Sequence, residues 1–311
     1  MGAVVASPIV TADLVIAVTS EGTLVFLDRA TGRVLETVTI GSAVESSPAL
    51  AAGVLHLGTD DGTLVGIGLA DARERYRAKV GSLVRSSPLV AGGLVLAGTI
   101  DGKGQGGLAA VTDAGAAQWT RKLAAVFSSP ALAGSVVVVG ADDGAVHAFD
   151  RATGTPAWSR KVGAKVRATP AVSGEVILVA AFDGTIAALR VADGTVAWER
   201  ALGHTVYSSP TVTSGLAVFG CHDGHIHGLD AATGAVRFQA ETGGPVLASP
   251  AAAGTRVLVA STDGHLYLLD DSGTVVQRLL LPGGATPSSP ALDGEDVFVG
   301  GGRGVHAVVI G

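Results

Sequence analysis

Val44-Glu45-Ser46-Ser47-Pro48 is the stretch of sequence that decides the fold, because the chain contains eight near-copies of it. The proline of each copy marks its position: Pro8, Pro48, Pro88, Pro130, Pro170, Pro210, Pro250 and Pro290. Successive prolines stand 40 residues apart, except for 42 residues between the third and the fourth. So regular a period over 311 residues indicates a repeat architecture, and every local interpretation has to respect it.

Each repeat has the same internal order of apolar and turn-forming residues. After Ser-Ser-Pro come a Gly-containing turn, an apolar run, Asp-Gly, a second apolar run, Asp-x-x-Thr-Gly and a last strand. Four short strands per repeat are typical of a propeller blade. We therefore expect an all-β fold, an eight-bladed β-propeller of four-stranded antiparallel blades, as one domain over residues 1–311. The blades are expected to start near residues 4, 44, 84, 126, 166, 206, 246 and 286.

The last blade is expected to differ from the others. Residues 286–310 supply three strands, and the residues before Val4 are too few to supply a fourth. We predict a three-stranded last blade whose outer edge is unpaired and open to contact. The alternative is that the sequence is part of a longer protein.

The turn residues and the tryptophans of the repeat agree with a four-stranded blade. Asp-Gly between two apolar runs predicts a tight hairpin, and Asp28-Arg29-Ala30-Thr31-Gly32 predicts a second turn at the opposite end of the blade. Trp119, Trp158 and Trp198 stand near the start of the fourth strand in blades 3, 4 and 5. We predict that they pack between adjacent blades and do not form an aromatic cage.

Composition excludes several classes of protein. A net charge of −6 argues against a nucleic-acid partner, which requires a basic surface. No apolar run approaches the length of a transmembrane helix, and the N-terminus carries no recognisable targeting segment. One cysteine, Cys221, excludes an internal disulfide. The chain is expected to be a monomer.

The repeat carries a family resemblance. Asp-Gly-x-x-x-(Ala/Leu)-x-Asp-x-x-Thr-Gly-x-x-x-Trp resembles the repeat of pyrroloquinoline-quinone (PQQ)-dependent dehydrogenases, which is similar to that of the outer-membrane assembly lipoprotein and of sensor propellers attached to bacterial kinases. The resemblance covers essentially the whole chain and implies the propeller fold, while it says little about function. It also implies an extracytoplasmic setting in bacteria. No other feature of the sequence identifies the compartment.

Quinone-dependent catalysis is disfavoured by what the sequence lacks. The resemblance implies that enzymes of this kind hold PQQ beneath an adjacent cysteine pair and bind calcium through Glu, Asn and Asp. This chain has one cysteine and no asparagine, and it is about half the length expected of such an enzyme. We predict that it is not an enzyme and has no cofactor, with a PQQ-dependent oxidoreductase as the alternative.

Two groups of residues are candidates for a metal site: the histidines and the paired aspartates. Five histidines lie close in sequence or in register with Cys221 and could in principle bind zinc or copper: His204, His222, His225, His227 and His265. Other blades carry ordinary core or surface residues at these positions, so we predict solvated or inter-blade histidines and no metal. The Asp-Asp-Gly hairpins at Asp60 and Asp142 offer too few oxygens for calcium. Cys221 occupies a Thr/Ala/Ser position and is predicted to be a small buried side chain.

A binding surface is predicted by comparing the repeats with one another. Two positions vary most in chemistry: the residue before Ser-Ser-Pro and the residue before the Asp-Gly hairpin. Both lie at one end of a blade, so they are expected to surround the channel mouth on one face, together with the insert Lys103-Gly104-Gln105-Gly106. Blades 2 to 6 place charged and aromatic residues there: Glu45, Asp60, Arg85, Phe127, Asp142, Arg167, Phe182, Tyr207 and His222. An alternative is that these residues are merely unconstrained ends of loops.

These observations favour a non-enzymatic binding or scaffold propeller that recognises a protein, a peptide or a small anionic ligand on one face and the central funnel. Arg85 and Arg167 are expected to hold carboxylates or phosphates of the ligand through bidentate pairs. The aromatic residues would add apolar area, and Glu45, Asp60, Asp142 and His222 would orient the ligand. A second alternative is the sensor domain of a larger signalling protein.

Overall fold

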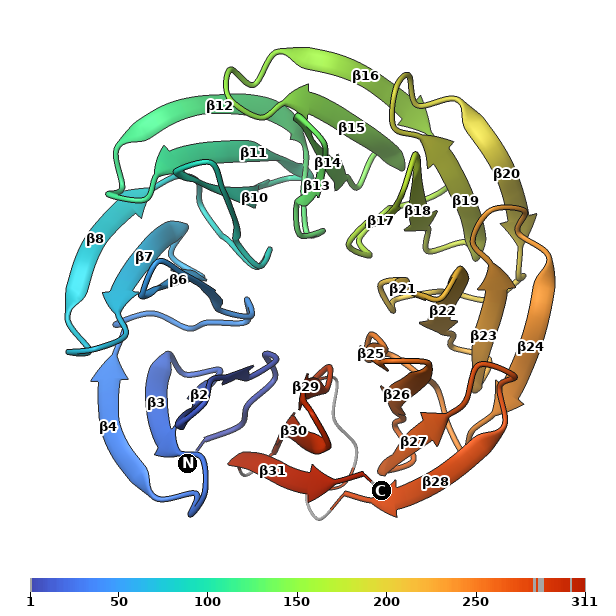
Figure 1. Cartoon of the computed structure of the whole chain (residues 1–311). Coiled ribbons are helices and arrows are strands. Elements are labelled where there is room, and N and C mark those ends of the chain that lie inside the picture. The colour runs from blue at the N-terminus through green and yellow to red at the C-terminus, as the bar shows by residue number, and fades with distance from the viewer. Residues whose placement is uncertain (1, 282–283, 285–287, 303, 311) are drawn as a thin grey trace.

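The computed structural model describes residues 2–281, 284, 288–302 and 304–310. In this part of the chain eight antiparallel sheets are arranged around a central axis, and no helix is present (Figure 1). Seven sheets have four strands, and the last has three, as the sequence predicts. The protein is an eight-bladed β-propeller. The expected start of blade 8 near residue 286 lies outside the described residues.

The strands follow one order from the channel outward in every blade. The innermost strands are β1 (Ile9–Val10), β5 (Ala49–Ala51), β9 (Leu89–Ala91), β13 (Ala131–Ala133), β17 (Ala171–Ser173), β21 (Thr211–Thr213), β25 (Ala251–Ala253) and β29 (Ala291–Asp293). The second strands are β2 (Leu14–Val18), β6 (Val54–Gly58), β10 (Leu94–Gly102), β14 (Val136–Gly140), β18 (Val176–Ala180), β22 (Leu216–Gly220), β26 (Arg256–Ala260) and β30 (Asp296–Gly301).

The outer half of each blade consists of a third and, in blades 1 to 7, a fourth strand. The third strands are β3 (Thr23–Asp28), β7 (Thr63–Gly68), β11 (Gln105–Thr112), β15 (Ala145–Asp150), β19 (Thr185–Arg190), β23 (His225–Asp230), β27 (His265–Leu269) and β31 (Gly304–Val309). The fourth strands are β4 (Val34–Thr39), β8 (Glu74–Lys79), β12 (Ala117–Ala124), β16 (Pro156–Lys161), β20 (Val196–Ala201), β24 (Val236–Glu241) and β28 (Val275–Leu280).

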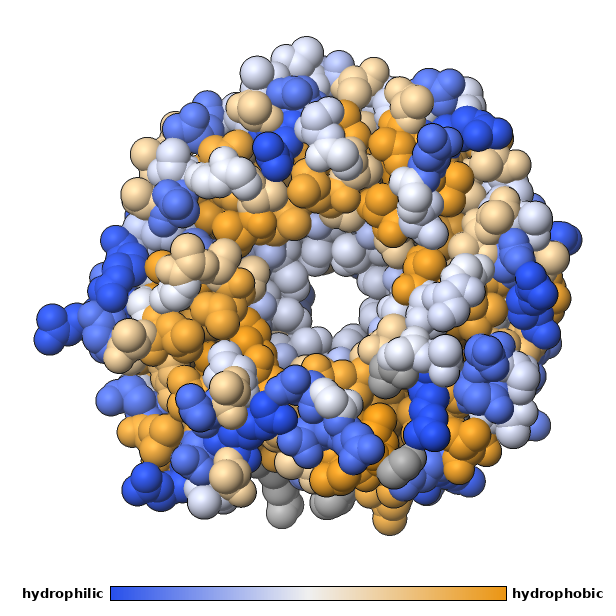
Figure 2. Space-filling view, in the orientation of Figure 1, coloured by the Kyte–Doolittle hydropathy of each residue, from blue (hydrophilic) through white to orange (hydrophobic). Residues whose placement is uncertain are grey.

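The Ser-Ser-Pro stretch forms the wall of the channel. The side-chain hydroxyl of the residue just before the proline accepts a hydrogen bond from the backbone N–H at the same position of the preceding blade. Ser47 Oγ, for example, accepts a hydrogen bond from the N–H of Ser7 at 3.0 Å. Seven such bonds connect the eight blades through Ser7, Ser47, Ser87, Ser129, Thr169, Ser209, Ser249 and Ser289. Figure 2 shows the result, an open hole whose wall is lined by residues of intermediate hydropathy.

The apolar core lies between the blades. In blades 1 to 7 a valine is buried just before the first strand: Val4, Val44, Val84, Val126, Val166, Val206 and Val246. Val84 lies against Gly58 of the preceding blade so closely that a Cβ at Gly58 would clash with it. Because each blade buries its faces only against its neighbours, stability depends on every junction of the ring.

The tryptophans join neighbouring blades, as predicted. The indole N–H of Trp119 donates to the backbone carbonyl of Arg151 in the next blade at 3.1 Å, and those of Trp158 and Trp198 bond equivalent carbonyls. The ring of Trp119 lies on the turn glycine of that blade, Gly154, whose added Cβ would meet it at 2.6 Å. Only glycine fits there, since its φ of 67° is also left-handed.

Blade 8 closes the ring against blade 1 by several contacts. The N–H of Val4 donates to the carbonyl of Gly301 at 2.9 Å. Arg29 of blade 1 forms ion pairs with Asp293 and Asp296 of blade 8, the second at 2.7 Å. Its guanidinium also lies 5.9 Å from the centre of the Phe298 ring. Polar and apolar contacts therefore both hold the closing junction.

Candidate functional site

The two variable positions of the repeat lie side by side on one face of the propeller. The residue before each Asp-Gly hairpin donates its backbone N–H to the start of its own blade, as Asp60 does to Ala43 at 2.8 Å and His222 does to Thr205 at 3.0 Å. The same hairpin accepts a bond from the start of the next blade, since Val84 donates to Thr59 at 2.9 Å. The variable residues thus alternate around the channel mouth. We call the nine candidate residues in blades 2 to 6 the ring face.

The first part of the ring face is a cluster of one arginine and two carboxylates. Arg85 forms a bidentate pair with Asp60 of the preceding blade, at 3.2 Å from Nε and 2.9 Å from its terminal nitrogen. Glu45 lies 3.2 Å from the same guanidinium. The hydrogen bonds that Arg85 donates to Asp60 raise the pKa of Arg85, so the cation is firmly charged. The cluster carries a net negative charge.

The second part is centred on Arg167. Its guanidinium holds Asp142 of the preceding blade through two hydrogen bonds of 2.7 Å, and Lys165 lies 3.3 Å from the same carboxylate. Burial alone would raise the pKa of Asp142, but the bonds and charges of Arg167 and Lys165 outweigh it and hold the pKa below its ordinary value. The guanidinium also lies 3.9 Å from the centre of the Phe127 ring, within cation–π range.

Aromatic rings continue the ring face beyond Arg167. Phe182 lies 5.2 Å from the guanidinium and 4.5 Å from the ring of Tyr207. His222 follows at 6.3 Å from Tyr207. Tyr207 is 47% exposed, so its ring is accessible to a partner. Phe127, Arg167, Phe182, Tyr207 and His222 therefore form a continuous strip across blades 4 to 6.

This geometry changes the role expected for the arginines. Both guanidinium forks are already bonded to the chain's own aspartates, so Arg85 and Arg167 hold neighbouring blades together. The sequence comparison missed these pairs because it compared equivalent positions and did not consider that a hairpin touches the start of the next blade. It also missed Lys165, whose position two residues before Arg167 was the available signal. The Lys165 side chain is half-exposed.

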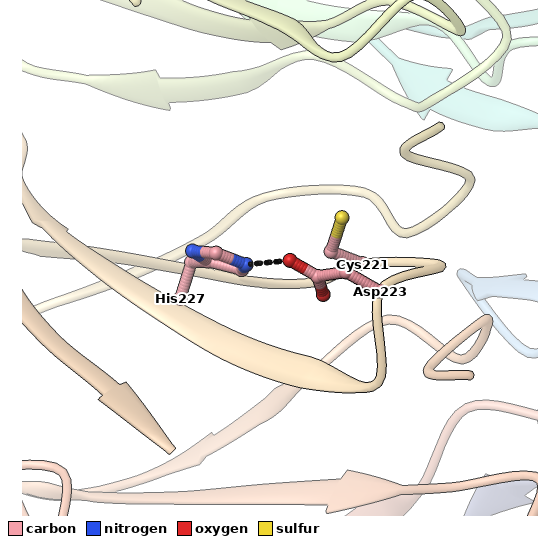
Figure 3. Close-up of side chains that lie close together, drawn as sticks. All are labelled: Cys221, Asp223 and His227. Atoms are coloured by element: carbon pink, nitrogen blue, oxygen red, sulfur yellow. Dashed lines mark hydrogen bonds and ion pairs between the residues drawn. The ribbon is translucent and has the colours of Figure 1, made fainter. Parts of the chain in front are cut away.

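A second group of side chains, which could in composition bind a metal, lies in blade 6 (Figure 3). The donor atoms of Cys221, Asp223 and His227 lie within 4.8 Å of one another, and the imidazole Nε2 bonds the Asp223 carboxylate at 3.0 Å. Cys221 is fully buried, as predicted, and burial raises the pKa of its thiol to about 11. Burial also lowers the pKa of His227, which is therefore neutral at pH 7. Asp223 was not singled out in the sequence.

Neighbouring blades show what this group does. In blade 4 the equivalent Asp143 bonds His147 at 3.2 Å, and in blade 7 Asp263 bonds Tyr267 at 2.6 Å, although these blades have alanine and serine in place of Cys221. A hydrogen bond between the hairpin aspartate and a side chain of the third strand is thus a structural feature shared by blades 4, 6 and 7. One zinc ion holds a sulfur and a nitrogen no more than about 4.4 Å apart, whereas these donor atoms lie within 4.8 Å of one another.

We expect the group to stabilise the blade without a metal. Cys221→Ala should lower the free energy of unfolding by only about 1 kcal/mol, because blades 4 and 5 already accommodate a buried alanine there. Thermal unfolding with added zinc should give the same Tm as without it, in both proteins. A zinc-dependent rise in Tm for the wild type, absent in Cys221→Ala, would instead identify a metal site.

The carboxylates of the Asp-Asp-Gly hairpins are likewise bonded within the protein. Asp60 and Asp142 hold arginines, as described above. Asp61 accepts a bond from the Thr59 hydroxyl, and Asp143 accepts one from the Ala145 N–H at 2.9 Å. Their oxygens thus have partners in the protein itself.

One known protein family matches nearly the whole of the chain. A family model described as "Outer membrane protein assembly factor BamB" matches residues 20–123, 104–242 and 208–310. The chain belongs to this family. The matches overlap and together extend over nearly the whole ring, in agreement with the repeat that the sequence shows. A comparison with curated proteins found no relative.

Solved structures share the fold of this family member at low identity. BamB from Moraxella catarrhalis is 20% identical, with a TM-score of 0.83 over 97% of this chain and 95% of that one. The computationally designed Ika8 protein is 19% identical, with a TM-score of 0.87 over 99% and 96%. A europium-containing methanol dehydrogenase is 12% identical, with a TM-score of 0.79 over 94% and 81%. At these identities the likeness extends to the fold alone.

Proposed function

We propose that this chain is a non-enzymatic scaffold propeller that binds an extended segment of a partner protein on the strip formed by Phe127, Arg167, Phe182, Tyr207 and His222. The observation that carries the proposal is the continuity of aromatic rings around a fixed cation, with Phe127 and Phe182 half-buried and Tyr207 and His222 exposed. Aromatic residues and arginine dominate the binding energy of protein interfaces. The family match, whose description names an assembly factor, supports a role in holding other proteins.

The contacts and charges of the strip indicate which kind of partner segment it would bind. Arg167 is fixed by Asp142 and Phe127, so the centre of the strip is ordered before a partner arrives, which reduces the entropic cost of binding. Lys165 adds a half-exposed positive charge beside it, while Arg85 is neutralised by Asp60 and Glu45. We infer a segment that places an apolar or aromatic residue on Phe182 and Tyr207 and a carboxylate near Lys165.

Peptides selected from a random library against the whole protein should depend on Tyr207. Tyr207→Ala should weaken their binding by about 30-fold, which corresponds to the roughly 2 kcal/mol of a hot-spot residue. Isothermal titration calorimetry measures this. Because Tyr207 is exposed, the variant should keep the Tm of the wild type. Arg167→Ala is less suitable, since it leaves the largely buried Asp142 without its main partner.

Ser20→Ala is the matched control, because Ser20 occupies the hairpin position of the ring in blade 1, outside the strip. It should leave the affinity unchanged. Selected peptides that bind Tyr207→Ala as tightly as the wild type, or that lose affinity with Ser20→Ala, would contradict the proposed site.

A further inference from the structure

Five consecutive junctions of the ring share one contact, an aromatic ring of a fourth strand on a turn glycine of the next blade. A Cβ added to the glycine would lie less than 3.0 Å from that ring in each case. The pairs are Tyr76 on Gly115, Trp119 on Gly154, Trp158 on Gly194, Trp198 on Gly234 and Phe238 on Gly273. In the three tryptophan junctions an arginine two residues later donates to the carbonyl of the same glycine, as Arg121 does to Gly154 at 2.6 Å.

Among the described residues, no such ring lies on the equivalent glycine of blade 1. Gly32 has nearly the same φ as Gly154, 68° against 67°, yet a Cβ added to it would meet nothing within 4 Å. A cavity of about 410 Å³ lies there, bordered by Asp28, Gly32, Phe298, Val305 and Ala307. The position that an aromatic ring fills at five other junctions is therefore open at the junction of blades 8 and 1.

A fourth strand that carried this ring would lie along the outer edge of β31. In the described residues β31 pairs only with β30, and its other edge faces outward where β4 to β28 lie in the other blades (Figure 1). Ala307 pairs with Phe298 as Ala148 pairs with Val138, and Ala148 is also the residue paired with Trp158. Ala148 is fully buried beneath that ring, whereas Ala307 is exposed. The register thus puts an incoming aromatic residue opposite Ala307.

Charge favours a cationic segment. Asp13, Asp28 and Asp296 line a second cavity that adjoins the first, and Arg29 is the one cation among its lining residues. The carbonyls of Arg29 and Gly32 correspond to those that accept the indole and guanidinium bonds at the complete junctions. Both the charge and the hydrogen-bond acceptors therefore match an aromatic residue followed, two positions later, by arginine.

We propose that blade 8 binds an extended segment of a second protein, of the pattern aromatic-x-Arg, as an antiparallel fourth strand along β31. The free backbone groups of the β31 edge would give affinity, and the cavity over Gly32 would select the aromatic residue. This site lies away from the ring-face strip and is independent of the function proposed above.

The test uses the full chain and a labelled synthetic peptide with the sequence of residues 155–162, Thr-Pro-Ala-Trp-Ser-Arg-Lys-Val, which is the fourth strand of blade 4. Fluorescence anisotropy should show saturable binding. The peptide with Trp158→Ala should bind at least about tenfold more weakly, and a peptide N-methylated at alternate amides should not bind. On the protein, Ala307→Phe should block the cavity and abolish binding, while Tyr207→Ala should leave it unchanged.

Three results would overturn the proposal. They are no saturable binding of the peptide, equal binding of the Trp158→Ala peptide, and equal binding to Ala307→Phe. A concentration-dependent dimer that Ala307→Phe dissociates would show that a second copy of the chain occupies the edge instead. Thermal unfolding of Ala307→Phe alone, with a Tm near that of the wild type, ensures that lost binding reflects a blocked site and not an unfolded protein.

Discussion

Alanine in place of Trp119 should lower the free energy of unfolding by about 3–5 kcal/mol, the usual cost of removing a buried aromatic side chain. Trp119 is only 8% exposed, and it bridges blades 3 and 4 through both its ring and its indole N–H. The Tm should fall by roughly 5–10 °C, since each kcal/mol lowers the Tm of a 150–250-residue domain by about 2–4 °C and that of a larger one by less. Chemical denaturation and calorimetry measure the two quantities.

The repeat supplies matched controls for this prediction. Glu36 holds the equivalent position in blade 1 and is exposed, so Glu36→Ala should change the Tm little. Gly154→Ala and Gly32→Ala impose the same left-handed strain, about 1–2 kcal/mol, but only the first also clashes with a ring. Gly154→Ala should therefore be clearly the more destabilising of the two. Equal losses for this pair, or a Trp119→Ala protein as stable as the wild type, would contradict the role assigned to the stacked ring.

The architecture could be predicted from the sequence because a period repeated eight times averages out local ambiguity. A single Asp-Gly or Ser-Ser-Pro means little, whereas the same order of turns and apolar runs at constant spacing leaves one economical fold. The repeat also predicted the side on which variable residues lie, since position within a blade determines the end of the blade. The three-stranded last blade followed from counting strands.

Pairings between blades could not be predicted in the same way. Arg85 and Asp60 are 25 residues apart and belong to different repeats, so alignment of the repeats places them in separate columns. The arginines therefore looked available for a ligand, although each is bonded within the protein. The turn from Asp28 to Gly32 is an ordinary copy of the repeat, so its own sequence does not reveal that no ring stacks on Gly32. That open position follows instead from the missing fourth strand of blade 8, which strand counting predicted, but its depth and charged lining could be seen only in three dimensions.

Deleting residues 296–311 should abolish cooperative folding, an effect larger than that of any single substitution considered above. The deletion removes β30 and β31, and with them Val297, Val299 and Ile310 from the core shared with blade 7. It also removes Phe298 from the core shared with Val15, Val25 and Leu27 of blade 1. Two apolar faces then become exposed at once. At about 1.5–3 kcal/mol for each large side chain, the loss approaches the whole net stability of a folded domain, about 5–15 kcal/mol.

The shortened chain should therefore aggregate, and circular dichroism should show no sharp thermal transition. Arg29→Ala is the milder comparison, because it removes the ion pairs to Asp293 and Asp296 but leaves the apolar contacts of Phe298 in place. It should remain folded, with a Tm lowered by a few degrees at most, since partly exposed ion pairs contribute about 0–1 kcal/mol each. A truncated protein that stays monomeric in size-exclusion chromatography and melts cooperatively near the wild-type Tm would show that the seven remaining complete blades support one another without closure. Stability would then be carried by pairwise junctions such as that of Trp119 and Gly154, and not by the closed ring.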